Sequence, residues 1–77
     1  MRTTYDERGY SLAGNAQRAR YKFALSRALA REAKQEAQAI ENAKERGAWL
    51  AIARESRQDA RRWLRALRVA NEAMQCA

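Results

Sequence analysis

The chain has 77 residues and carries 16 lysines and arginines against 9 aspartates and glutamates, a formal net charge of +7 with no histidine and no proline. It offers no nucleophile–base pair, no metal-binding cluster and no glycine-rich phosphate loop, since its single cysteine, Cys76, lacks a partner. We therefore expect a non-catalytic binding protein without cofactor or metal, and not an enzyme.

Residues 1–14 are predicted to form a short N-terminal arm. Thr4 followed three residues later by Glu7 fits a capping box, which could start one helical turn that Gly9 would end. The alternative is an extended arm whose Tyr5 and Tyr10 rings pack back onto the helices, because a tyrosine ring needs an apolar surface. The pattern leaves both structures open.

Residues 15–46 are predicted to form the first helix, with Asn15 as its N-cap and no proline or glycine to interrupt it. Its apolar side chains fall on one arc, which we expect to face a second helix. The arc consists of Leu25, Ala28, Leu29, Ala33, Ala37, Ile40 and Ala43, with Tyr21 and Phe23 at its margins. We expect Glu32 and Glu36, in or beside this arc, to pair with arginines of another helix and not to form a catalytic acid pair.

Gly47 is predicted to be the turn between two helices. A left-handed glycine after a helix lets the chain reverse, and this reversal would bring the two apolar faces together. The predicted fold is therefore all-α, a two-helix antiparallel hairpin that completes a bundle by dimerisation or by docking on a partner. The alternative is one continuous or kinked helix, since no capping residue follows Gly47.

The second helix is predicted at residues 48–74, with one apolar line at alternating steps of four and three residues. This line comprises Trp49, Ala53, Ser56, Ala60, Trp63, Leu67, Ala70 and Met74. For the two tryptophans, core packing is favoured over stacking on nucleic-acid bases, because a stacking platform must be exposed.

Arginines form the strongest functional pattern of the sequence. The candidate anion-binding residues are Arg54, Arg57, Arg61, Arg65 and Arg68 on the second helix, and Arg20, Arg27 and Arg31, with Lys34 beside them, on the first. Like charges at these spacings cost a few tenths of a kcal/mol per pair, so they indicate binding to an anion array; a merely solvated face is the alternative. A turn at Gly47 would gather these charges into a positive pole at the open end of the hairpin.

Two functions follow from this pattern. In the first, the arginines bind nucleic-acid phosphates with little sequence specificity. In the second, the protein is a small inhibitor or adaptor, of the kind phages and mobile elements encode, that binds an acidic surface of a host protein. The small, alanine-rich core predicts a homodimer or an obligate partner. The lack of a long apolar run predicts a cytoplasmic protein without membrane contact.

Overall fold

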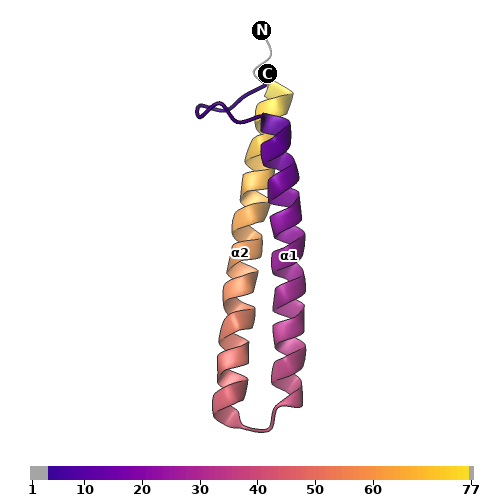
Figure 1. The fold of residues 1–77 in the computed structure, drawn as a ribbon, viewed down its shortest axis with the longest axis vertical. Helices are drawn as coiled ribbons and strands as arrows, with labels where there is room; N and C mark the ends of the chain where they lie inside the picture. The colour runs from indigo at the N-terminus through magenta and orange to yellow at the C-terminus, as the bar shows by residue number, and fades with distance from the viewer. Residues whose placement is uncertain (1–3, 77) are drawn as a thin grey trace.

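In the computed structural model, which describes residues 4–76, the chain forms two long antiparallel helices preceded by a short arm (Figure 1). The helices are α1 (Leu12–Ala39) and α2 (Ala43–Cys76), and they form a rod of 59 × 16 × 15 Å. The predicted all-α helical hairpin is thus confirmed. Neither helix contains, within the described range, an apolar stretch long enough to cross a membrane.

The chain reverses at residues 40–42 and not at Gly47. Ile40 leaves the helical conformation with φ −98° and ψ 126°, and Asn42 caps α2: its Oδ1 accepts the backbone N–H groups of Lys44 (2.9 Å) and Glu45 (3.2 Å). The guanidinium of Arg46 donates to the Ile40 carbonyl at 2.9 and 3.1 Å. These bonds satisfy backbone groups that the ends of the two helices would leave without partners.

The predicted break at Gly47 is therefore wrong, and with it the predicted helix boundaries at residues 46 and 48. Gly47 lies inside α2 with a negative φ, and a Cβ built on it would meet nothing within 4 Å. A solvent-exposed glycine inside a helix costs about 1 kcal/mol of stability. The Asn42 cap stabilises the start of α2 by a similar amount, and so it offsets the cost of keeping Gly47 in the helix. Asn42 followed three residues later by Glu45 is a capping pattern, and this pattern marks the start of α2 in the sequence.

The two helices pack through their smallest side chains. The buried residues of α1 are Leu12, Ala16, Ala19, Ser26, Ala30, Ala33 and Ala37, and those of α2 are Ala53, Ser56, Ala60 and Ala70. We call the alanines and serines among them the small-residue seam. With the half-buried Phe23 and Ile40, the seam of α1 follows alternating steps of three and four residues, as in a coiled coil. The predicted line on α2 faces α1, with Trp49, Trp63 and Leu67 half-buried and Met74 36% exposed.

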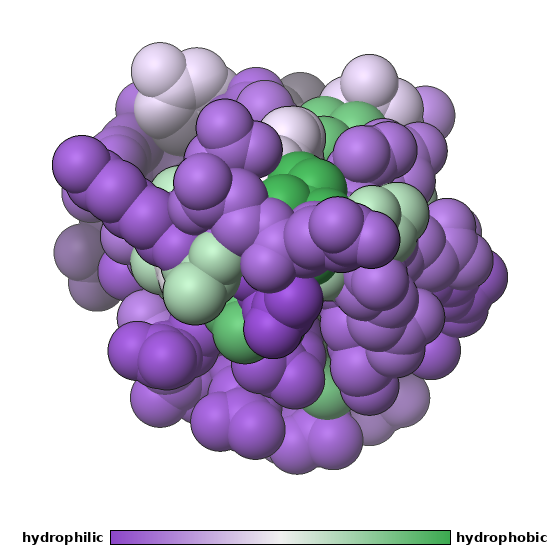
Figure 2. Space-filling model, turned by 90° about the horizontal axis from the view of Figure 1, so that it is seen from below, coloured by the Kyte–Doolittle hydropathy of each residue, from purple (hydrophilic) through white to green (hydrophobic). Residues whose placement is uncertain are grey.

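The apolar arc predicted for the first helix is wrong in its rotation. Leu25 and Leu29 are 40% and 46% exposed, and Ala28 is exposed as well. Only Ala33 and Ala37 of that arc are buried, because the contact between the helices selects small side chains, not the most apolar ones. Viewed along the rod from the turn, the surface is mostly hydrophilic, with hydrophobic residues in separate patches (Figure 2).

The position of the turn predicts the effect of replacing Gly47. Because Gly47 is helical and has free space around its Cα, Gly47→Ala should raise the free energy of unfolding by about 0.5–1 kcal/mol. Urea denaturation followed by circular dichroism measures this change. A loss of stability would mean that Gly47 adopts the left-handed conformation of a turn.

Candidate anion-binding groove

A groove lined by five basic residues runs between the helices on one side of the rod. Arg27, Arg31 and Lys34 come from α1, and Arg57 and Arg61 come from α2. Its apolar lining comprises Phe23, Ala30, Ala60 and Leu64, and its volume is about 460 Å³. None of the residues that line it is acidic. The groove therefore presents uncompensated positive charge from two helices to one volume of solvent.

The coiled-coil spacing extends this basic side beyond the groove. Residues seven apart lie on the same side of such a helix, which aligns Arg20 with Arg27 and Lys34, and likewise Arg54 with Arg61 and Arg68. The basic face, as we define it, consists of Arg20, Arg27, Arg31, Lys34, Arg54, Arg57, Arg61 and Arg68. It contains seven of the eight arginines proposed from the sequence.

Arg65 is the candidate that the structure separates from the others. In the seven-residue repeat of α2, Arg65 lies midway between the basic face and the opposite side of the rod. Its side chain therefore extends from α2 away from α1. It is exposed and does not line the groove. Arg65 therefore serves as a control for the arginines that line the groove.

One groove arginine is held by an aromatic ring. The guanidinium carbon of Arg27 lies over the Phe23 ring, 5.6 Å from its centroid. Phe23 is half-buried beside the seam, so the ring is fixed by packing and supports a cation–π contact. The contact limits the motion of Arg27 at the groove while its N–H groups stay available to an anion.

The positive charge forms a central band and not the pole predicted at the open end. Residues 16–31 contain five basic groups and no acid, and residues 53–68 contain six arginines against Glu55 and Asp59. The turn at residues 40–42 sets these two segments side by side, as the lining of the groove shows. The predicted positive pole assumed a reversal at Gly47. With the turn at residues 40–42, the basic residues instead form a central band, and further acidic residues lie toward both ends of the rod.

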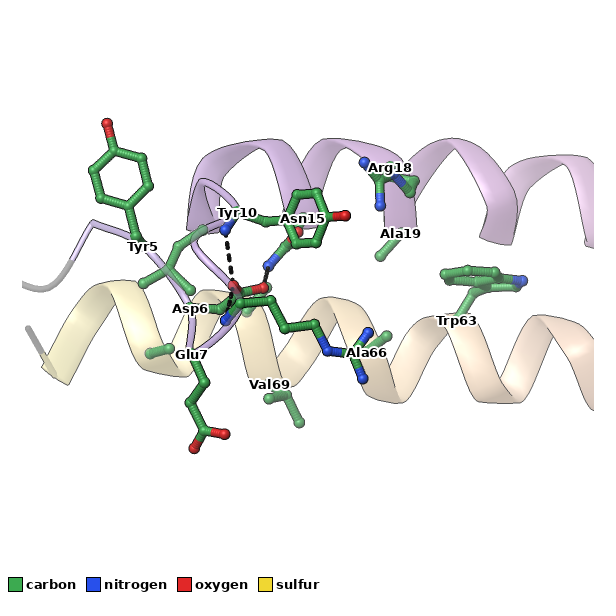
Figure 3. Close-up of a pocket in the computed structure, with 14 residues that line it drawn as sticks. Tyr5, Asp6, Glu7, Tyr10, Asn15, Arg18, Ala19, Trp63, Ala66 and Val69 are labelled. Carbon is green, nitrogen blue, oxygen red and sulfur yellow. Dashed lines mark hydrogen bonds between the residues drawn. The ribbon is translucent and has the colours of Figure 1, made fainter.

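A second, larger cleft lies near the arm on the other side of the rod. It has a volume of about 920 Å³ and lies between the arm, α1 and α2, next to Trp63 (Figure 3). Its lining includes Tyr5, Asp6, Glu7, Arg8, Tyr10, Asn15, Arg18 and Val69. Because acids and bases both line it, this cleft lacks the single sign of charge that marks the groove.

Asp6 organises the arm. Its Oδ1 accepts the backbone N–H groups of Arg8 and Tyr10, each at 2.9 Å, and its Oδ2 accepts the side-chain amide of Asn15 at 2.8 Å (Figure 3). Gly9 closes the turn with φ +86° and donates its N–H to the Asp6 carbonyl at 3.0 Å. The hydrogen bond from Asn15, followed by that from Tyr10, lowers the pKa of Asp6 below its usual value of 3.8.

The arm differs from the helical turn considered for Thr4 to Glu7. Asp6 and Gly9 occupy the first and last positions of a β-turn, a spacing that the sequence displays and the capping-box interpretation missed. Tyr5 pairs with Ser11 in an isolated β-bridge, and Ser11 caps α1, so that α1 begins at Leu12 and not after Asn15. Tyr5 and Tyr10 are 60% and 54% exposed, and Tyr10 lies 5.9 Å from the guanidinium carbon of Arg18.

No family model, curated protein or solved structure matches this chain. Within the described part of the chain, no three histidine, cysteine, aspartate or glutamate residues come together in a group that could hold a metal ion. The side chain of Cys76 lies outside the part that the structure describes.

The Asp6 hydrogen bonds predict that the arm detaches in acid. A carboxylate whose pKa is lowered by folding stabilises the docked arm above its unfolded pKa, and this contribution is lost as the pH falls through the folded value. We expect the backbone amide resonances of Arg8 and Tyr10 and the side-chain amide of Asn15 to move together below about pH 4 in NMR spectra. Asp6→Ala, which removes both acceptor oxygens, should give the detached spectrum at neutral pH. Unchanged resonances from pH 6 to 2 would contradict this role.

Proposed function

We propose that the basic face binds the phosphates of nucleic acid with little sequence specificity. The observation that carries this proposal is the groove itself, in which two helices place five basic side chains together without an acid. Antiparallel helices stabilised by surface charge alone would carry opposite charges at the facing positions. Here Arg57 and Arg61 face Arg27 and Arg31, and an anion bound between them would turn this repulsion into attraction.

The length of the face suits a nucleic-acid backbone. Arg20 to Lys34 and Arg54 to Arg68 each extend over about 21 Å at about 1.5 Å per residue. That length corresponds to about six base pairs of duplex at about 3.4 Å each. An array of this length can contact several phosphates at once, which gives affinity without reading the sequence.

The shape of the rod argues for backbone contacts over base contacts. The major groove of B-DNA is about 12 Å wide and admits a single helix. The basic face spans two packed helices in a rod that, with the arm, measures 16 × 15 Å across. The pair cannot enter the groove broadside, so its arginines would lie across phosphates, which position a protein but do not specify a sequence.

The test is a titration with generic duplex and single-stranded DNA at about 50 and 200 mM salt. With about five phosphate contacts, affinity should fall by two to three orders of magnitude between these salt concentrations. Replacing both Arg57 and Arg61 by Gln should weaken binding at low salt and reduce the slope of log K against log salt by about 2.

The matched control is Arg62→Gln with Arg65→Gln. It removes the same charge from the same helix at two residues that do not line the groove. We expect this pair to change the salt slope by less than about 1. Equal losses of affinity in the two double variants would show that the net charge of the protein, and not the basic face, drives binding. No binding at low salt would contradict the nucleic-acid proposal and leave an acidic protein surface as the target of the arginines.

A further inference from the structure

The side of α1 opposite the basic face carries a second regular line of residues. Leu25 and Leu29, 40% and 46% exposed, occupy its centre, although both are large apolar side chains on a protein with few of them. In order along α1 the line reads Arg18, Lys22, Leu25, Leu29, Glu32 and Glu36, at steps of four, three, four, three and four residues. We call this line the self-pairing face. Its spacing equals that of the small-residue seam, so it forms a straight line along the same helix.

The order of charges along this face is self-complementary. Two basic residues lie toward the arm, two leucines lie in the middle, and two acids lie toward the turn. When a second copy is laid antiparallel, Arg18 meets Glu36, Lys22 meets Glu32, and Leu25 meets Leu29. Each of these pairs occurs twice about a twofold axis. A parallel arrangement would instead set each charge beside its own copy.

We propose that two copies of the chain associate through this face, with their α1 helices antiparallel and a twofold axis between Leu25 and Leu29. Among the described residues, Leu12 is the only large side chain that is buried in the hairpin, whose core is otherwise alanine and serine. A hairpin of this size gains little free energy from burying alanine side chains. Removing four leucines from water, two from each copy, would add apolar area to the buried core that the hairpin alone lacks. The dimer is a four-helix bundle, in which this face of α1 is covered.

The proposed dimer leaves nucleic-acid binding independent. Arg27 and Arg31 lie on the side of α1 that faces the groove, and the self-pairing face lies on the other side of the same helix. Both grooves therefore remain open and point away from each other. The arm lies at the end of the face, where the Tyr10 ring holds the guanidinium of Arg18.

Analytical ultracentrifugation of the full chain tests the association. We expect a dimer, and both E32K/E36K and R18E/K22E should weaken it at least tenfold because each makes the face uniform in charge. An equimolar mixture of the two variants should restore the dimer, since one face is then entirely basic and the other entirely acidic. The charged residues of the face are exposed, so circular dichroism should show intact helices in each variant.

Leu29→Ser and Leu50→Ser form a matched pair. The two leucines are 46% and 43% exposed, but Leu50 lies on α2, at a heptad position on the side of the basic face. Leu29→Ser should weaken the dimer at least tenfold, and Leu50→Ser should leave it unchanged. A protein that stays monomeric at high micromolar concentration, or a dimer insensitive to Leu29 and to the charge reversals, would overturn the proposal.

Disulfide trapping tests the orientation. In a Cys76→Ser background, Leu25→Cys and Leu29→Cys variants are mixed in equal amounts and oxidised. The antiparallel register predicts that the mixed 25–29 disulfide forms faster than either symmetric one, because only that pair is level across the axis. Preference for the symmetric disulfides would indicate a parallel dimer and contradict the proposed register. An unmodified protein that stays monomeric but binds DNA with the expected salt dependence would refute this inference alone.

Discussion

The close contact of α1 and α2 through alanine and serine is the constraint on which the other features depend. Small side chains let two helices approach, and the contact fixes the rotation of each helix about its own axis. Because Ala30, Ala33 and Ala37 occupy the contact, Leu25 and Leu29 are directed outward, and Arg27 and Arg31 lie at the groove. One packing choice therefore separates a basic side of the rod from a side with leucines and ordered charges.

The turn fixes the axial position of α2 relative to α1. Asn42 caps α2 and Arg46 binds the carbonyl of Ile40, so the reversal is fixed by hydrogen bonds within seven residues. A reversal at Gly47 would have moved α2 by about eight residues, or about 12 Å, relative to α1. Arg27 would then lie level with Leu67 and not between Arg57 and Arg61, with which it lines the groove, and the charges would gather at one end. The central band of charge results from the position of the turn.

Much of the architecture could be predicted from the sequence, and the errors have identifiable causes. Two long helices, the apolar line of α2 and seven of the arginines on the basic face follow from helical periodicity, because tryptophans and arginines mark their faces clearly. The rotation of α1 does not, since alanines occur all around that helix and its leucines dominate any apolar arc. The roles of Asn42 and Asp6 depend on capping and turn patterns only four residues long. The sequence prediction places the turn at Gly47 and not at Asn42, and it considers a capping box of Thr4 with Glu7 in place of the Asp6–Gly9 turn.

The rotation of α1 can be tested most directly by comparing Ala30→Leu with Ala28→Leu in thermal or urea denaturation. Ala30 is 8% exposed in the small-residue seam, whereas Ala28 is exposed and belongs to the arc predicted from sequence. Overpacking the seam should lower the free energy of unfolding by about 1–3 kcal/mol for Ala30→Leu. For Ala28→Leu we expect a change within about 0.5 kcal/mol. The reverse result would mean that α1 turns its leucines toward α2, and both faces described for the rod would be lost.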